Sequence, residues 1–175
     1  MWFGLVTSVI GFSAVNIIPS ESQSVLSALE TELATTVSAV SDVRQLDVRN
    51  QLCVAFISLE RGHRARVLQC DRKDLSLKVW LIDYGKMATV WVAAPLPEHL
   101  HPSVVPSFAI RVSPNREQYA GVTFTDYKEL LEVTSPEVMV SVRDSPETTT
   151  AVCSHVWLYT QDGSDVFDLH GVRSH

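Results

Sequence analysis

Two short runs of apolar, largely β-branched residues open the chain, with turn-forming residues between them. Leu5–Ile10 and Ala14–Ile18 flank residues 11–13, a Gly-Phe-Ser segment in which Gly and Ser favour a tight reversal. Pro19 cannot donate a ladder hydrogen bond, so it ends the second run. The pattern predicts an N-terminal β-hairpin.

A helix is predicted to begin directly after this hairpin. Ser20 is placed to cap the helix, and Gln23, three residues later, can complete a capping box. Apolar residues then recur at steps of three and four, which places them on one helix face. These residues are Leu26, Leu29, Leu33, Val37 and Val40. Such a stripe must pack against another part of the protein.

The period of the pattern changes to two from Gln51 onward. Alternating positions and tight polar turns predict short strands about ten residues apart. Strands are expected at 51–57, 63–70, 75–82 and 87–92. Strands this short and this tightly connected indicate a small, strongly bent barrel. We expect one five-stranded barrel, formed mainly by residues 51–112.

The segments on either side of this barrel predict a second lobe. A proline-rich bridge, with Pro at 95, 97, 102 and 106, leads into strands expected at 107–112, 137–143 and 151–160 and a helix at 123–132. Like the N-terminal elements, these have apolar sides that need partners. We therefore expect one mixed lobe, assembled from both ends of the chain. It should contain the helix near Ser20 and the helix near Thr123 together.

Composition and charge narrow the possible partners. The 175 residues include 20 Asp and Glu against 14 Lys and Arg, a net charge of -6, and 46% are hydrophobic. The hydrophobic share is typical of a folded domain. The acidic balance disfavours nucleic acid and favours a basic peptide as the partner. Gly and polar residues interrupt the apolar stretch 1–18, so neither a signal peptide nor a membrane span is expected.

The residue spacing gives little support for metal sites, disulfides or catalysis. Cys53, Cys70 and Cys153 form no paired motif and are expected to be reduced thiols. His99 and His101 have no third ligand within reach by spacing. Neither a Ser-His-Asp arrangement nor the carboxylate cluster that phosphodiester hydrolysis requires is visible. We expect no enzymatic activity, no cofactor and no metal.

Ordered motifs in the central segment resemble the core of a Tudor domain. They are Phe56 at a strand end, GHRARV at 62–67, LIDYGK at 81–86, PLPEHL at 95–100 and the following PSFAIRV. The flanking elements resemble the extended form of this domain, in which a staphylococcal-nuclease-like lobe is split around the Tudor barrel. The resemblance implies a mostly β fold with α helices, in which a five-stranded Tudor-type barrel accompanies a split, OB-fold-like α+β lobe. It implies a single domain, with 51–100 as the Tudor core and 1–50 and 101–175 as the two parts of the lobe.

The resemblance also implies a function. Extended Tudor domains bind arginine-rich tails, often symmetrically dimethylated, of Piwi-type Argonautes in germline small-RNA pathways. The chain would then be a non-catalytic scaffold of piRNA-type machinery in the cytoplasm, at perinuclear germ granules. Its partner would be such a tail or another scaffold protein. Two alternatives stay open: a docking or dimerisation domain with an empty cleft, and an RNA-binding module that uses the nuclease-like lobe.

Carried over position by position, the resemblance places an arginine pocket at Phe56, His63, Leu81, Tyr84 and Lys86. Phe56 and Tyr84 keep the aromatic character of the family pattern, in which ring faces attract a guanidinium. His63 and Leu81 stand where the family pattern has aromatic residues, and the loss of these two rings weakens cation binding by roughly 1–4 kcal/mol. Lys86 repels a bound cation by about 1 kcal/mol at 4 Å in water. We therefore expect a degenerate pocket with weak or no selectivity for dimethyl-arginine. Arg64 and Asp83 are expected to pair across neighbouring strands in a structural role.

Overall fold

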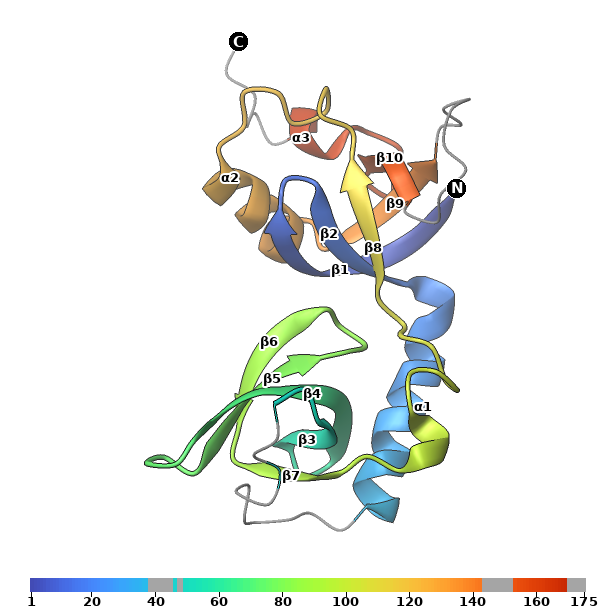
Figure 1. Ribbon diagram of the computed structural model, residues 1–175. Helices are drawn as coiled ribbons and strands as arrows, with labels where there is room; N and C mark the ends of the chain where they lie inside the picture. Colours follow the sequence, from blue (N-terminus) through green and yellow to red (C-terminus); the bar gives the residue numbers. More distant parts are fainter. Residues whose placement is uncertain (38–45, 47–48, 143–152, 170–175) are drawn as a thin grey trace. The chain divides into compact units, whose positions relative to one another are not determined.

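The computed structural model describes residues 1–37, 46, 49–142 and 153–169. These residues form strands β1–β10 and a few helices, so the fold is mostly β (Figure 1). The chain divides into two compact units. Unit 1 comprises Met1–Ser20 and Ala109–His175, and unit 2 comprises Glu21–Phe108. Unit 1 is therefore assembled from both ends of the chain, with unit 2 inserted between them in sequence.

Unit 1 is built around a closed five-stranded barrel with the strand order β1-β2-β8-β10-β9. The strands are β1 (Trp2–Gly11), β2 (Ala14–Pro19), β8 (Ile110–Pro114), β9 (Glu137–Val142) and β10 (Cys153–Tyr159). Paired strands are antiparallel, except that β8 and β10 are parallel. The predicted N-terminal hairpin is confirmed as β1 and β2, the dark blue pair in Figure 1.

Helical segments complete the core of unit 1. They are α2 (Phe124–Glu129), the π-helical segment η3 (Leu130–Thr134) that continues it, and α3 (Val166–Leu169). The Thr123 side chain accepts a hydrogen bond from the backbone N–H of Asp126 and caps α2. Tyr127, Leu131 and Phe167 are fully buried in one apolar core with residues of the barrel strands. The helix predicted at 123–132 is thus confirmed, with its apolar side on the barrel.

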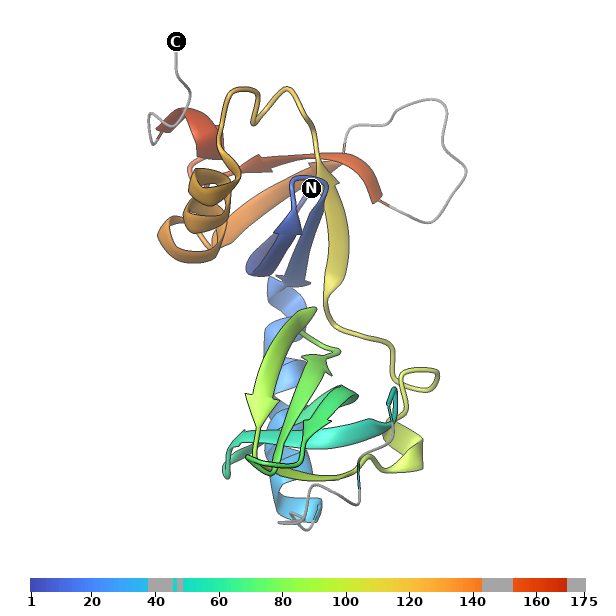
Figure 2. The same cartoon turned by 60° about the vertical axis from the view of Figure 1, so that its left-hand side comes forward.

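Unit 2 contains a five-stranded antiparallel sheet with the order β6-β5-β4-β3-β7. The strands are β3 (Leu52–Ser58), β4 (Arg61–Asp71), β5 (Ser76–Leu81), β6 (Lys86–Val90) and β7 (Val92–Pro95). The sheet curls strongly in both ribbon views (Figure 2), and the side chains of Ala65, Leu77 and Val79 form part of its buried inner core. Because side chains alternate along a strand, the neighbouring positions lie on the outer face of the sheet.

Helix α1 (Ser20–Thr36) covers part of that outer face. Leu33 of α1 is buried with Val54 and Phe56 of β3 in a second apolar core of unit 2. Gly62 permits the close approach, because a Cβ at this position would lie 2.9 Å from the Leu33 Cβ. The predicted stripe is confirmed where it is described: Leu26 and Leu33 are buried, Leu29 and Val37 are partly buried, and Val40 lies outside the described residues.

Two expectations about the lobes need correction. The helices near Ser20 and Thr123 do not share a lobe, because the apolar stripe of α1 packs on β3 and places α1 in unit 2. The units accordingly divide after Ser20 and Phe108, not after residues 50 and 100. Strand β8 pairs with β2 and β10 in unit 1, so the fifth strand of the central sheet is β7. The closed barrel is the one built from the chain ends.

Candidate functional site

A buried carboxylate organises one end of unit 2. Glu30 of α1 is 1% exposed, and its Oε1 accepts hydrogen bonds from the Tyr84 hydroxyl at 2.5 Å and from His63 Nδ1 at 3.0 Å. Its Oε2 lies 3.4 Å from a guanidinium nitrogen of Arg61, whose side chain is half exposed. Glu30 lies on the face of α1 that packs against the sheet, so its carboxylate contacts Arg61 and His63 of β4 and Tyr84 of the β5–β6 turn.

The surroundings of Glu30 favour its ionised form. Burial alone would raise the pKa of Glu30, but hydrogen bonds from His63 and Tyr84 and electrostatic interactions with His63 and Arg61 together outweigh burial, so the pKa is lowered. Burial and the hydrogen bond to Glu30 raise the pKa of Tyr84 well above its usual range. The site therefore holds a fixed negative charge beside a neutral phenol.

Two further side chains, those of His63 and Lys86, contact the Tyr84 ring. The His63 ring meets it edge to face, with ring centroids 5.7 Å apart at 71°. The Lys86 ammonium lies 5.4 Å from the centre of the Tyr84 ring, a cation–π contact. Gly85, at φ 65°, allows the tight turn that brings Tyr84 and Lys86 together. A cation can therefore approach one face of this ring.

The structure brings only part of the predicted pocket together. His63, Tyr84 and Lys86 meet, whereas Phe56 and Leu81 are 6% and 1% exposed and belong to two different apolar cores. Phe56 points toward α1, which the sequence-based prediction had placed in the other lobe. Leu81 points into the curled sheet beside Ala65 and Val79. Neither side chain presents a free face to a ligand, so their roles as pocket walls are not supported.

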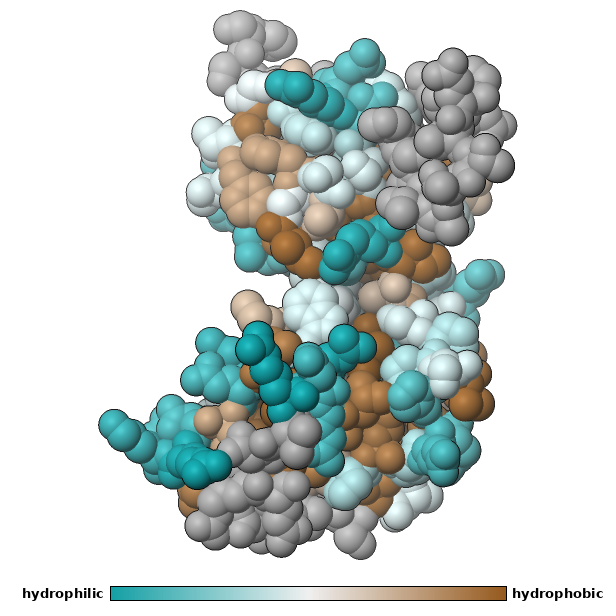
Figure 3. All heavy atoms as spheres, in the orientation of Figure 1, coloured by the Kyte–Doolittle hydropathy of each residue, from teal (hydrophilic) through white to brown (hydrophobic). Residues whose placement is uncertain are grey.

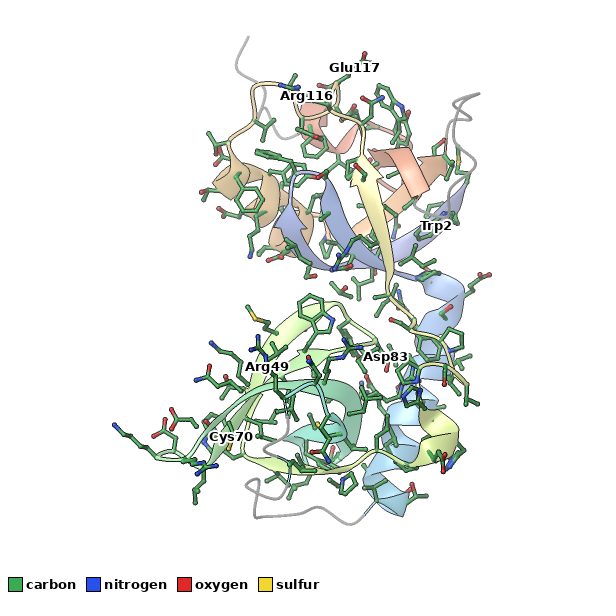
Figure 4. The ribbon with its side chains drawn as sticks, viewed as in Figure 1. Trp2, Arg49, Cys70, Asp83, Arg116 and Glu117 are labelled. Atoms are coloured by element: carbon green, nitrogen blue, oxygen red, sulfur yellow. The ribbon has the colours of Figure 1, made fainter. Side chains whose placement is uncertain are left out.

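The predicted pairing of Arg64 with Asp83 is confirmed. Nitrogens Nε and Nη2 of the Arg64 guanidinium donate to the Asp83 carboxylate at 2.9 and 2.5 Å. Figure 4 labels Asp83 in unit 2. Both side chains are buried. Arg64 also donates to three backbone carbonyls, those of Leu100, Val105 and Pro106. This residue pair ties the bridge after η2 (Glu98–Leu100) to the sheet, which is a structural role.

Comparison with protein families identifies the chain. The family model described as the Tudor domain matches residues 4–127. The chain belongs to the Tudor domain family. Tudor domains are interaction modules and not enzymes. A comparison with curated proteins gives no match.

Solved structures show the same fold over nearly the whole chain. Extended-Tudor 9 of Drosophila melanogaster superposes with a TM-score of 0.70 at 20% identity, covering 95% of this chain and 92% of that one. A complex of Tudor with Aubergine [R15(me2s)] gives 0.67 at 18% identity, covering 96% and 98%. The Drosophila melanogaster Papi extended Tudor domain (D287A), in complex with an unmethylated Piwi N-terminal peptide (R10-unme), gives 0.58 at 13%, covering 98% and 97%. The expected extended Tudor architecture is confirmed.

Sequence reasoning missed two residues of this Tudor domain's site, Glu30 and Arg61. A clue was present, because Glu30 follows Leu26 by four positions and precedes Leu33 by three. It therefore lies on the apolar face of α1, where an unpaired carboxylate would be costly. A charge at such a position indicates a polar partner on the opposing element. Identifying that partner as Tyr84 and His63 requires knowing that α1 packs on the central sheet.

The described part of this Tudor domain offers little for metal, disulfide or membrane chemistry. No group of three or more His, Cys, Asp or Glu side chains there is arranged to hold a metal ion. Cys53 and Cys70 form no disulfide, and burial raises the pKa of Cys53 to about 12. Among the same residues, no helix is long and apolar enough to cross a membrane.

Proposed function

We infer that this Tudor domain binds an arginine-containing segment of a Piwi-type Argonaute through the surface around Tyr84. It would act as a non-catalytic scaffold of a piRNA-type small-RNA pathway, in the cytoplasm at germ granules. The observation that carries the proposal is the grouping of a half-buried tyrosine ring, a cation on its face and a buried carboxylate beneath it. The structurally similar Tudor and Papi domains are seen with Aubergine and Piwi peptides.

Charge supports a cationic ligand at this site. The ring face of Tyr84 accommodates the Lys86 ammonium, and the negative charge of Glu30 lies behind the ring hydroxyl. A ligand guanidinium, which is planar and weakly hydrated, would gain from the same ring and charge. Lys86 and Arg61 occupy this environment as internal cations, so an incoming arginine has to compete with them. Affinity is therefore expected to be modest.

Selectivity for dimethyl-arginine is expected to be weak. Each methyl group replaces one N–H donor and adds apolar surface, so a reader gains from dimethylation when several ring faces surround the methyl groups. Here Phe56 and Leu81 are buried in cores, and His63 is engaged with Glu30. Tyr84 is the pocket residue left to offer a ring face, and Lys86 already lies over it. Methylated and unmethylated arginine thus meet nearly the same surface.

The proposal is tested by removing the internal cation. Lys86→Gln should bind an arginine-containing N-terminal peptide of a Piwi-type Argonaute about fivefold more tightly, because repulsion of about 1 kcal/mol is relieved. Lys73→Gln, in the β4–β5 turn, makes the same change in net charge and should leave affinity unchanged. Tyr84→Leu, checked for folding by circular dichroism, should abolish binding. Unchanged binding by Tyr84→Leu would refute the proposal.

A further inference from the structure

A second surface of unit 2 carries two exposed cations and no carboxylate of its own. It is the outer face of β4, β5 and β6, formed by Arg66, Lys78, Trp80, Met87 and Thr89, and is called here the Trp80 face. The strand register places Arg66, Trp80 and Met87 side by side in one row. The adjacent row contains Lys78 and Thr89. Residues directly opposite one another on paired strands share a face, so these five form one continuous surface.

Within the described part of unit 2, no helix or strand packs over the Trp80 face. Helix α1 and the bridge cover the part of the outer sheet face around Phe56, Gly62 and Arg64, but not this part. Met87 is 62% exposed, Arg66, Lys78 and Thr89 are exposed, and Trp80 is half-buried. Trp91, which follows the end of β6, is 58% exposed. Figure 3 shows strongly hydrophilic side chains over β4–β6, with a less hydrophilic region at their upper edge.

The chemistry of the Trp80 face fits a protein ligand that is acidic and partly apolar. Within the described residues, neither Arg66 nor Lys78 forms an ion pair, and none of the five residues of the face is acidic. Tryptophan, methionine and arginine are among the residues enriched at protein–protein contacts. The Trp80 face exposes these residue types together. Its two unpaired cations can bind carboxylates, and Trp80 and Met87 can pack against an apolar side chain.

Unit 2, which carries the Trp80 face, is nearly neutral, whereas unit 1 is acidic. Unit 1 has five Lys and Arg against ten Asp and Glu, a net charge of -5, whereas unit 2 has nine against ten, a net charge of -1. Two cations on neighbouring strands about 5 Å apart, Arg66 on β4 and Lys78 on β5, can engage two carboxylates of one extended segment. A nucleic acid would need a longer track of cations and would meet a net charge of -6 on the whole chain. The balance favours a peptide.

We propose that the Trp80 face binds an acidic segment of a partner protein, with its carboxylates on Arg66 and Lys78 and an apolar side chain on Trp80 and Met87. This ligand has the opposite charge to the arginine segment proposed for the Tyr84 site. One domain would then hold two partners of different chemistry, as a scaffold does. The proposal does not depend on the arginine-binding function, because the two surfaces share no residue.

A fluorescein-labelled peptide of Asp and Glu residues around a central Phe-Leu pair tests this proposal on the full chain. It should bind, and the double variant Arg66→Glu/Lys78→Glu should bind at least about tenfold more weakly. Arg72→Glu/Lys73→Glu, in the β4–β5 turn, makes the same change in net charge and should lose less than about twofold. Met87→Ser should weaken binding without any change of charge.

Matched probes separate the possible outcomes. The same peptide with Lys at every acidic position should not compete for the face, and an oligouridine of equal charge should bind more weakly. In amide NMR spectra of the wild-type protein, the acidic peptide should shift signals of β5 and β6. The proposal is overturned if the two double variants lose affinity equally, if the oligouridine binds more tightly, or if the shifts lie elsewhere. Binding of the arginine peptide by Arg66→Glu/Lys78→Glu reports separately on the Tyr84 site.

Discussion

At the scale of single residues, Glu30 determines the character of the Tyr84 site. Glu30→Gln should lower the free energy of unfolding at pH 7 by about 1–3 kcal/mol, because hydrogen bonds to a buried carboxylate are replaced by bonds to a neutral amide. The variant isolates the charge, since the amide keeps a similar shape and one acceptor oxygen. Urea unfolding followed by circular dichroism measures the difference.

The pH dependence of this difference follows from the lowered pKa of Glu30, whose ordinary value is 4.5. The ionised carboxylate stabilises the folded state fully above pH 4.5, and this contribution is lost as the pH falls through the lower folded-state pKa. The gap between wild type and Glu30→Gln should therefore be constant above pH 4.5 and shrink below it. A gap that widens in acid would contradict the assignment.

Leu81 shows why the pocket cannot be rebuilt from the sequence motif alone. Leu81→Tyr would add a ring at a side chain that is 1% exposed in the core of the curled sheet. Overpacking of this kind costs about 1–3 kcal/mol. Met87→Tyr adds the same group at a 62% exposed position of the paired strand and should change stability by less than about 0.5 kcal/mol. Equal effects of the two variants on thermal unfolding would rule out the core position of Leu81.

At the scale of elements, the contact between α1 and β4 depends on one glycine. Gly62→Ala should destabilise the protein by about 1–3 kcal/mol, because its Cβ would lie 2.8 Å from Val54 Cγ1 and 2.9 Å from Leu33 Cβ. Gly11→Ala is the matched control, since its Cβ would meet no atom within 4 Å. Chemical denaturation of both variants tests whether α1 is seated on the sheet. Similar stabilities would argue against this packing.

The sequence predicted most elements but not their partners. Local pattern was enough for the hairpin, for a helix directly after Pro19 and for the helix predicted at 123–132, because periodicity and turn residues act within a few positions. The predicted strand at 87–92 is divided into β6 and β7 around Trp91. The apolar stripe of α1 indicated that the helix is packed but not against what. Because the partner of this stripe was unknown, α1 was assigned to the wrong lobe. For the same reason Phe56 was assigned to the pocket and Glu30 was omitted from it.

At the scale of the whole molecule, each apolar core lies within one of the two units. Among the described residues, two core clusters draw only on 21–108, and the third draws only on 1–20 and 109–175. The fragment 21–108 should therefore fold alone and unfold cooperatively. The fragment 109–175 lacks β1 and β2, two of the five barrel strands, and should remain unfolded by itself. Circular dichroism and thermal melts check both. A non-cooperative melt of 21–108 would show that unit 2 needs the rest of the chain.

We propose that this Tudor domain recognises arginine through Tyr84 and the charge of Glu30, with little contribution from methyl groups. Calorimetric titration of the full chain with two Piwi-type peptides, identical except for symmetric dimethylation of one arginine, tests it most directly. The two dissociation constants should agree within about threefold, and Tyr84→Leu should abolish both binding events. A preference of tenfold or more for the methylated peptide, about 1.4 kcal/mol, or no binding of either peptide, would contradict the claim.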